Sequence, residues 1–153
     1  MFTHTNTNSI RSAMTTLQGL GVVKVNIGFS GGNDEGGADA ITYLDAAGEK
    51  VETGLPETGA YQSTEFDATT NTWKPTGWIV TEWDRDTGKH SNRPATDEEV
   101  RATQLREVLE APIYDRFGSF AGEFSVYGDL TWDVATGTHE MHGQESYSQW
   151  DSF

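Results

Sequence analysis

The alternation of apolar and polar residues along this chain predicts hairpins built around a recurring turn. Between residues 124 and 134, apolar side chains recur at every second position, which is typical of a strand buried on one face. An Asp, a four-residue loop and a second alternating run follow, and similar turns occur at residues 66–73 and 83–90. Each loop ends in Gly or Asn, residues that adopt the left-handed conformation needed to close it. The sequence therefore predicts three antiparallel hairpins.

The residues beside these loops predict the register of the paired strands. If each loop has four residues, Phe66 faces Trp73, Trp83 faces His90, and Trp132 faces His139. Aromatic cross-strand pairs stabilise antiparallel strands, whereas a slip by one residue would place every side chain on the wrong face. We therefore expect these three pairs. In the same register Asp84 faces Lys89 but Asp133 faces Thr138, so we expect the last hairpin to present an acidic end without a basic neighbour.

Two stretches show the spacing of amphipathic helices. Residues 8–20 carry apolar side chains three or four positions apart, and residues from Thr96 onward repeat that pattern. Thr96 and Glu99 have the spacing of a capping box, in which each side chain accepts the other residue's amide proton. We expect Pro112 to kink the second helix or to begin a new turn.

These elements predict an α+β fold: a mostly antiparallel sheet built from hairpins, with two α-helices packed on one face. The length fits a single domain over residues 1–153, in which residues 54–95 form a hairpin elaboration. Residues 148–153 are predicted to be a flexible, acidic and aromatic tail.

Several local features carry further expectations. The glycine-rich residues 30–37 predict a long, flexible acidic loop, and a strand is expected at about residues 49–53. Pro75 indicates a short strand or a sheet edge, and Gly128 indicates a bulge. Residues 91–95 are expected to interrupt the sheet.

The charge of the chain points to the class of its partner. Twenty-four acidic and ten basic residues give a net charge of −14, which makes direct binding to a nucleic-acid backbone improbable because phosphates require Lys and Arg. Such an excess of acidic residues has two explanations. It keeps the protein soluble or is typical of an acid-rich proteome, such as that of a salt-adapted organism, or it forms a surface that binds a basic protein. No Lys or Arg follows Arg116, so the expected partner-binding residues lie in the last hairpin and tail: Glu123, Asp129, Asp133, Glu140, Glu145, Trp150 and Asp151.

The residue content limits the other kinds of site. Without cysteine the chain has no disulfide, thiol nucleophile or cysteine-ligated zinc. His139 and His142 fall on opposite faces of a strand, so we predict no metal site between them. The sequence contains no coherent active site, so we also predict no cofactor and no catalytic residues. The start of the chain lacks a signal-peptide pattern, and no apolar run has the length of a membrane span. We therefore expect a cytoplasmic protein that binds no membrane.

The glycine-rich stretch offers an alternative site for a nucleotide or metabolite. Its ligand-binding residues would be Ser30, Gly31, Gly32, Asn33, Asp34 and Glu35. The stretch resembles the phosphate-binding start of PP-loop ATPases, although Glu35 stands where that motif has a hydroxyl residue. A hydrolase that uses Ser30 as nucleophile, or an acid-bound metal, is a further alternative.

Two stretches resemble a family of small uncharacterised acidic proteins from bacteria and their phages. They are residues 29–36 with the preceding strand, and the stretch from the end of the second helix at Tyr114 to Val134. The resemblance as a whole extends over about half of the chain. The resemblance implies a phage or mobile-element accessory protein and supplies no activity. We therefore expect a non-enzymatic protein that binds a basic surface, for example an inhibitor of a host defence nuclease that mimics nucleic acid. A small-ligand-binding protein and a phage structural or assembly protein are the alternatives.

Overall fold

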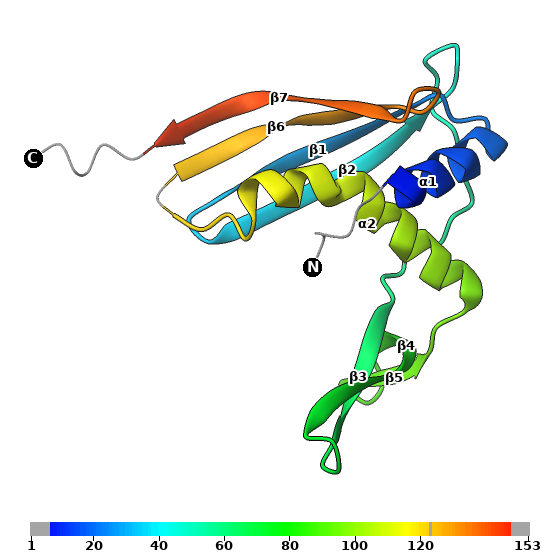
Figure 1. The fold of residues 1–153 in the computed structure, drawn as a ribbon, viewed down its shortest axis with the longest axis vertical. Helices are drawn as coiled ribbons and strands as arrows, with labels where there is room; N and C mark the ends of the chain where they lie inside the picture. Colours follow the sequence, from blue (N-terminus) through cyan, green and yellow to red (C-terminus); the bar gives the residue numbers. More distant parts are fainter. Residues whose placement is uncertain (1–6, 123, 148–153) are drawn as a thin grey trace, which may run out of the picture. The chain divides into compact units, whose positions relative to one another are not determined.

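The structure is a computed structural model that describes residues 7–122 and 124–147. Its helices and strands follow one another along the chain in the order shown in Figure 1. They are α1 (Thr7–Gly19), β1 (Lys24–Gly32), β2 (Glu35–Leu44), β3 (Tyr61–Asp67), β4 (Thr72–Asp84), β5 (Lys89–Pro94), α2 (Asp97–Phe117), β6 (Phe124–Asp133) and β7 (Thr138–Tyr147).

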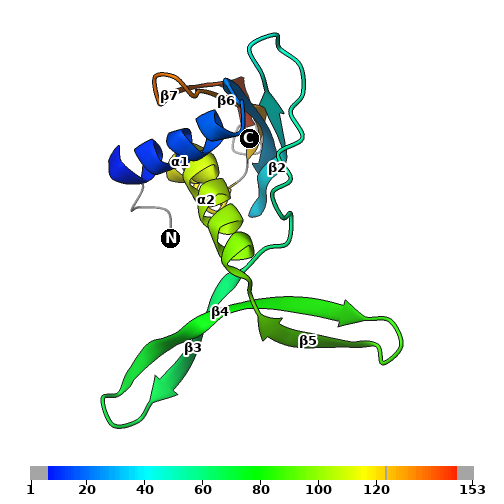
Figure 2. The same cartoon turned by 90° about the vertical axis from the view of Figure 1, so that its right-hand side faces the viewer.

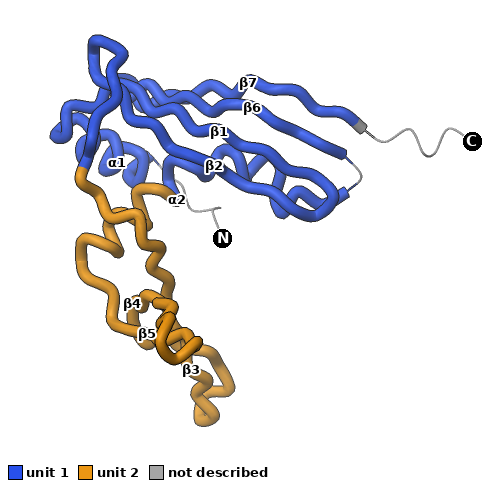
Figure 3. The backbone as a smooth tube through the Cα atoms, turned by 180° about the vertical axis from the view of Figure 1, so that it is seen from behind, with its two compact units in different colours: residues 1–53, 107–153 blue, residues 54–106 orange. Residues whose placement is uncertain are grey.

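The chain divides into two compact units, which are coloured separately in Figure 3. Unit 1 consists of residues 1–53 and 107–153, and unit 2 consists of residues 54–106. Helix α2 contributes its first half to unit 2 and its second half to unit 1. The predicted α+β class is confirmed, and the strands form two antiparallel sheets where the sequence indicated one.

Unit 1 is a four-stranded antiparallel sheet with helices on one face. The strand order is β2-β1-β6-β7, and α1 and the second half of α2 pack on the same side of this sheet (Figure 1). Alternate residues of β1 and β6 point into the core, as their pattern predicted. The fully buried side chains include Leu17, Val25, Ile27, Leu109, Ile113, Phe120, Leu130, Trp132 and Val134.

Trp132 connects the sheet of unit 1 to α2. Its side chain has no solvent exposure, and its indole Nε1–H donates a 2.8 Å hydrogen bond to the Leu109 carbonyl. Leu109 lies in the helical turn before Pro112, whose missing N–H removes the helical hydrogen bond to the neighbouring carbonyl of Val108. Helix α2 nevertheless continues through Pro112 to Phe117.

Unit 2 is a three-stranded antiparallel sheet centred on β4. Strand β3 pairs with residues 72–79 of β4, and β5 pairs with residues 79–84, so the two hairpins extend in opposite directions in Figure 2. Pro75 lies in the part of β4 that β5 does not reach. The edge position is therefore confirmed for that part, while the expectation of a short strand is wrong because β4 has 13 residues. Residues 91–94, expected to interrupt the sheet, belong to β5.

The predicted hairpin registers are confirmed by the strand pairing. Phe66 faces Trp73, Trp83 faces His90, and Trp132 faces His139. The rings of these pairs lie 5.3, 4.8 and 4.7 Å apart between centroids. The turn geometry is confirmed at Asn71, Gly88 and Gly137, which have φ angles of 55°, 66° and 68°.

Three local expectations are wrong. Gly128 lies in an unbroken register with β7, and the irregularity falls instead between β1 and β2, beside Ile27 and Phe29. Residues 49–53 form only one isolated bridge, between Lys50 and Leu44. The glycine-rich residues 30–37 are part of the β1–β2 hairpin, whose tip is Asn33-Asp34 with φ angles of 53° and 70°.

Candidate functional site

The four-stranded sheet of unit 1 has an open face, which we define as the face opposite α1 and α2. It consists of the polar residues that alternate with the core residues of β1 and β6, together with their partners on β7. Because the helices cover only the other side of the sheet, most of these side chains are exposed. The open face presents Lys24, Asn26, Ser30, Tyr127, Asp129, Thr131, Asp133, Thr138, Glu140, His142 and Gln144.

Hydrogen bonds across the strands hold the polar side chains of the open face. The Tyr127 hydroxyl donates to Gln144 Oε1 at 2.8 Å, joining β6 to β7. The Thr131 hydroxyl donates to Asn26 Oδ1 at 3.1 Å, joining β6 to β1. These contacts fix side chains that would otherwise sample several rotamers, so the face is an ordered polar surface.

Three carboxylates lie close together on the open face. Asp129 faces His142, Asp133 faces Thr138, and Glu140 faces the intervening residue Thr131. Glu140 is therefore the diagonal neighbour of both aspartates, a relationship that places residues roughly 7–8 Å apart in an antiparallel pair. The arrangement is a triangle of negative charges on two adjacent strands.

Asp133 has a double role at one corner of this triangle. Its Oδ1 accepts hydrogen bonds from the amides of Ala135 and Thr136, at 3.0 and 3.3 Å, as the turn pattern implied. The expectation that Asp133 has no basic neighbour is wrong, because Lys24 of β1 lies directly opposite it on its other side. Pairing between β1 and β6 spans about a hundred residues of sequence, so the local hairpin pattern carried no sign of it.

Glu145, which the sequence grouped with these acids, lies on the other face of the sheet. It faces Val126, a core residue, and its Oε1 lies 3.4 Å from Arg116 Nη2 of α2. The alternation of β7 places Glu145 on the opposite side from Glu140. The remaining predicted partner-binding residues, Glu123, Trp150 and Asp151, lie outside the described residues.

The two units share the net charge unequally. Unit 1 contains 15 acidic and 4 basic residues, a net charge of −11, whereas unit 2 contains 9 acidic and 6 basic residues, a net charge of −3. The carboxylates of the open face thus belong to the strongly acidic unit. Repulsion among these charges favours a cationic partner over a neutral or anionic one.

The β1–β2 hairpin needs its glycines because an aromatic ring packs against it. Gly31 and Gly36 face each other across the hairpin, and the fully buried ring of Phe120 lies against both. A Cβ atom on Gly31 would lie 2.3 Å from the Phe120 ring, and one on Gly36 would lie 2.8 Å from it. Phe120 also stacks on Phe117, with 5.6 Å between ring centroids. The glycines therefore allow close packing against Phe120. The glycine-rich composition alone had indicated a flexible loop.

The amides of this hairpin are already hydrogen-bonded within unit 1. Asn33 N–H donates to the Gly122 carbonyl at 3.1 Å, and Asp34 N–H donates to the Phe120 carbonyl at 2.8 Å. Ala38 N–H donates to the Tyr114 hydroxyl at 3.2 Å. A phosphate-binding loop needs amides that point at the ligand and a helix that follows. Here a strand follows, and these three amides have protein acceptors.

Ser30 lies on the open face, outside this packing. Its hydroxyl donates to Asp39 Oδ2 at 3.3 Å, and the residues directly opposite it are Gly37 and Tyr127. A serine nucleophile needs a general base within hydrogen-bond reach, and neither opposite residue is a histidine. Ser30 therefore contributes a hydrogen-bonded hydroxyl to the polar surface of the open face.

The two histidines of β7 point to opposite faces, as their spacing predicted. The His139 ring lies beside Trp132, whereas His142 Nε2 lies 3.3 Å from Glu140 Oε2 on the open face. Within residues 7–122 and 124–147, no three His, Asp or Glu side chains come close enough to hold a metal ion.

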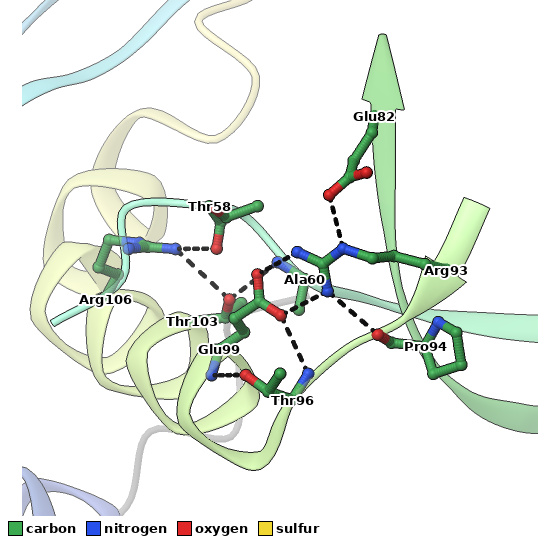
Figure 4. Close-up of polar contacts among 9 residues, drawn as sticks. All are labelled: Thr58, Ala60, Glu82, Arg93, Pro94, Thr96, Glu99, Thr103 and Arg106. Carbon is green, nitrogen blue, oxygen red and sulfur yellow. Dashed lines mark hydrogen bonds and ion pairs between the residues drawn. The ribbon is translucent and has the colours of Figure 1, made fainter. Parts of the chain in front are cut away.

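In unit 2, Arg93 joins the sheet to the start of α2 (Figure 4). Its guanidinium donates two 2.8 Å hydrogen bonds to the Glu99 carboxylate and one of 2.6 Å to Glu82. Thr96 and Glu99 form the predicted capping box, with amide-to-side-chain distances of 3.0 and 3.2 Å. The hydrogen bonds from Arg93, and then those from Thr96, lower the pKa of Glu99 to about 2. These contacts hold the start of α2 in place, and they occupy the guanidinium of Arg93 with the carboxylates of Glu82 and Glu99.

Unit 2 also carries most of the exposed aromatic side chains, which the sequence treated only as hairpin pairs. Trp73 is 68% exposed and Trp83 is 57% exposed, and each packs on its cross-strand partner, Phe66 or His90. Cross-strand packing explains their presence in a sheet with few buried residues. Sequence reasoning placed His142 correctly beside Asp129 but missed two other members of the open face, Lys24 and Tyr127. The polar positions of the alternating strands were the signal that could have identified them.

Among the described residues, no helix is both long and apolar enough to cross a membrane.

Comparisons with protein-family models, with curated proteins and with solved structures gave no match for this chain. The resemblance to small acidic phage and bacterial proteins therefore stays a prediction.

Proposed function

We propose that this chain is a non-enzymatic binding protein whose open face receives a basic surface of another protein. The observation that carries the proposal is the convergence of Asp129, Asp133 and Glu140 on one exposed face. They belong to a unit with a net charge of −11. Complementary charge accelerates association and selects partners of the opposite sign.

The order of the open face supports this role. Its carboxylates stand on paired strands, and neighbouring side chains such as Tyr127 and Gln144 are tied by hydrogen bonds. A surface that is already ordered loses little conformational entropy when a partner binds. The open-face side chains of β1, β6 and β7 are polar, which suits a partner that presents Lys and Arg side chains and no apolar patch.

The specific form of the proposal is an inhibitor encoded by a phage or a mobile element. Its partner would be a nucleic-acid-binding enzyme such as a host defence nuclease, whose basic surface ordinarily receives phosphates. Acidic residues at diagonal positions of paired strands, roughly 7–8 Å apart, offer such a surface a substitute array of negative charges. A protein of this kind would act by occupying the nucleic-acid site and would need no catalytic group.

The experiment compares three forms of the full chain as immobilised bait in bacterial extract. They are the wild type, an open-face triple variant (Asp129→Asn, Asp133→Asn, Glu140→Gln) and a control triple variant (Glu57→Gln, Asp86→Asn, Glu107→Gln). The control removes the same charge from exposed residues elsewhere. We expect the wild type and the control to retain a basic protein that is released by salt or by double-stranded DNA, and the open-face variant to lose it. Equal capture by both triple variants would refute the open face as the binding surface.

A further inference from the structure

The edge strand β7, beside the open face, has the properties of a site for strand addition. We propose that an extended segment of the basic partner, bearing Lys or Arg at alternate positions, pairs with β7 as a fifth strand. This inference rests on the proposed function and specifies how the partner is held. In this arrangement the backbone of β7 forms hydrogen bonds with the partner segment, and the side chains of the open face bind its Lys and Arg side chains.

The outer edge of β7 is long and regular. The strand comprises ten residues, contains no proline and pairs with β6 without any shift in register. Natural edge strands are protected by bulges, prolines, short length or charged side chains, because their unpaired amides attract other strands. Within the described ranges, β7 has no bulge and no proline and pairs with no strand other than β6, and the charges that protect it are the glutamates Glu140 and Glu145. Negative charges of this kind repel an acidic strand and leave the edge open to a basic one.

The opposite edge of the same sheet is irregular and is covered at one end. The pairing of β2 with β1 shifts beside Ile27 and Phe29, and Lys50 forms a bridge with Leu44 at the end of β2. Val51 N–H donates a 2.8 Å hydrogen bond to the Tyr43 carbonyl on that edge. The contrast leaves β7 as the regular edge of this sheet.

The hydrogen-bond pattern identifies which residues of β7 point outward. Val134 N–H donates to the Val23 carbonyl at 3.0 Å, so the polar groups of Val134 and of alternate residues before it face β1. Those of Asp133, Thr131 and Asp129 therefore face β7 and bond to Thr138, Glu140 and His142. By the same alternation, the backbone groups of His139, Met141 and Gly143 point away from the sheet.

The charges beside this edge select the occupant. An added strand would place alternate side chains next to Glu140 on the open face, with Asp129 one strand further in. Strand β7 contains no Lys or Arg, so a second copy of the chain would bring glutamates together, each copy carrying a net charge of −14. Opposite charges on adjacent strands are favourable and like charges are not. A Lys- or Arg-bearing segment meets that condition.

The probe is a ten-residue peptide in which lysine alternates with valine, and its control replaces each lysine with glutamate. Amide hydrogen exchange of the full chain is followed by NMR with and without each peptide. We expect the lysine peptide to slow exchange at Met141 and Gly143 by at least about tenfold, because outward amides gain acceptors in a complex. Amides of β6 that already face β7 should change little. Unchanged exchange at Met141 and Gly143 with the lysine peptide bound would overturn strand addition.

A pair of variants tests the backbone contribution directly. Met141→Pro removes an outward N–H that the β6 pairing does not use, a position at which an edge strand tolerates proline. Met141→Ala removes the same side chain and keeps the N–H. We expect Met141→Pro to bind the lysine peptide roughly three- to tenfold more weakly than Met141→Ala, the loss of about one hydrogen bond. Thermal unfolding verifies that both variants fold, and equal affinities would contradict the proposal.

The outcomes separate the edge from the face. If the open-face triple variant no longer binds the peptide while Met141→Pro binds as tightly as Met141→Ala, the open face is the binding surface and strand addition at β7 is wrong. If the amides of β7 are protected and the triple variant binds as tightly as the wild type, strand addition is supported and the proposed role of the open-face carboxylates is wrong. Concentration-dependent protection of Met141 and Gly143 without peptide would show a second copy at the edge and would overturn the proposed occupant.

Discussion

The indole N–H of Trp132 donates a 2.8 Å hydrogen bond to the carbonyl of Leu109, connecting the buried face of β6 to the turn of α2 that precedes Pro112. Both groups are inaccessible to solvent, since Trp132 and Leu109 have no exposed surface. The carbonyl therefore depends on a side chain 23 residues away for this bond. The sheet that carries the open face is positioned on its helix by this contact.

Replacing Trp132 with Phe should test the buried position of the indole. The change removes the N–H donor to the Leu109 carbonyl and the pyrrole part of the ring, so the free energy of unfolding should fall by at least about 1–3 kcal/mol. Trp83→Phe is the control, because Trp83 is 57% exposed and has its ring on His90. Denaturant unfolding followed by circular dichroism compares the two variants. Equal loss in both would show that the indole N–H of Trp132 contributes nothing.

The glycine-rich hairpin provides a matched pair within one strand. Gly31→Ala should destabilise the protein by about 1–3 kcal/mol, because the new methyl group would overlap the buried Phe120 ring. Gly28→Ala should be neutral or slightly stabilising, because no atom lies within 4 Å of its Cβ position. The midpoints of urea denaturation provide the comparison. A Gly31→Ala protein as stable as Gly28→Ala would mean that the hairpin is the mobile loop expected from its composition.

The contrast between these two glycines explains why the expectation of a flexible loop at residues 30–37 was wrong. Glycine permits both flexibility and close approach, and only the position of Phe120, about 90 residues later, decides between them. The same limit applies to Asp133, whose neighbour Lys24 comes from a distant strand. Contacts of long sequence separation determine both environments.

Local contacts were predictable for the opposite reason. The pairs Phe66–Trp73, Trp83–His90 and Trp132–His139 each span one turn, so loop length and alternation were enough to set their register. The capping box at Thr96 and Glu99 was equally local. For the candidate site, alternation placed Asp129 and Glu140 on their strands. The odd spacing between Glu140 and Glu145 was the signal that Glu145 lies on the opposite face, and grouping the acids by charge alone overlooked it.

Acid should weaken the start of α2 through Glu99. Its pKa is lowered to about 2 in the folded protein from an ordinary value of 4.5, because Arg93 and Thr96 donate hydrogen bonds to its charged form. A group with a lowered folded pKa stabilises the protein above its unfolded pKa, and that contribution is lost as the pH falls from 4.5 towards 2. The Tm of wild type should therefore exceed that of Glu99→Gln by a constant amount above about pH 5. The difference should shrink below that pH, and a Tm difference that is the same at pH 3 and pH 7 would contradict this role for Glu99.

The most direct test of the open face is an NMR titration of the isotope-labelled full chain with a short lysine oligomer. If the face receives cationic segments, amide shifts should change most at Asp129, Asp133 and Glu140, and added salt should reverse the changes because it screens exposed charges. The acidic first turn of α2, Asp97 and Glu98, is an internal control with similar local charge. Changes that are largest at that turn, or spread evenly over all acidic residues, would contradict the assignment of the binding surface.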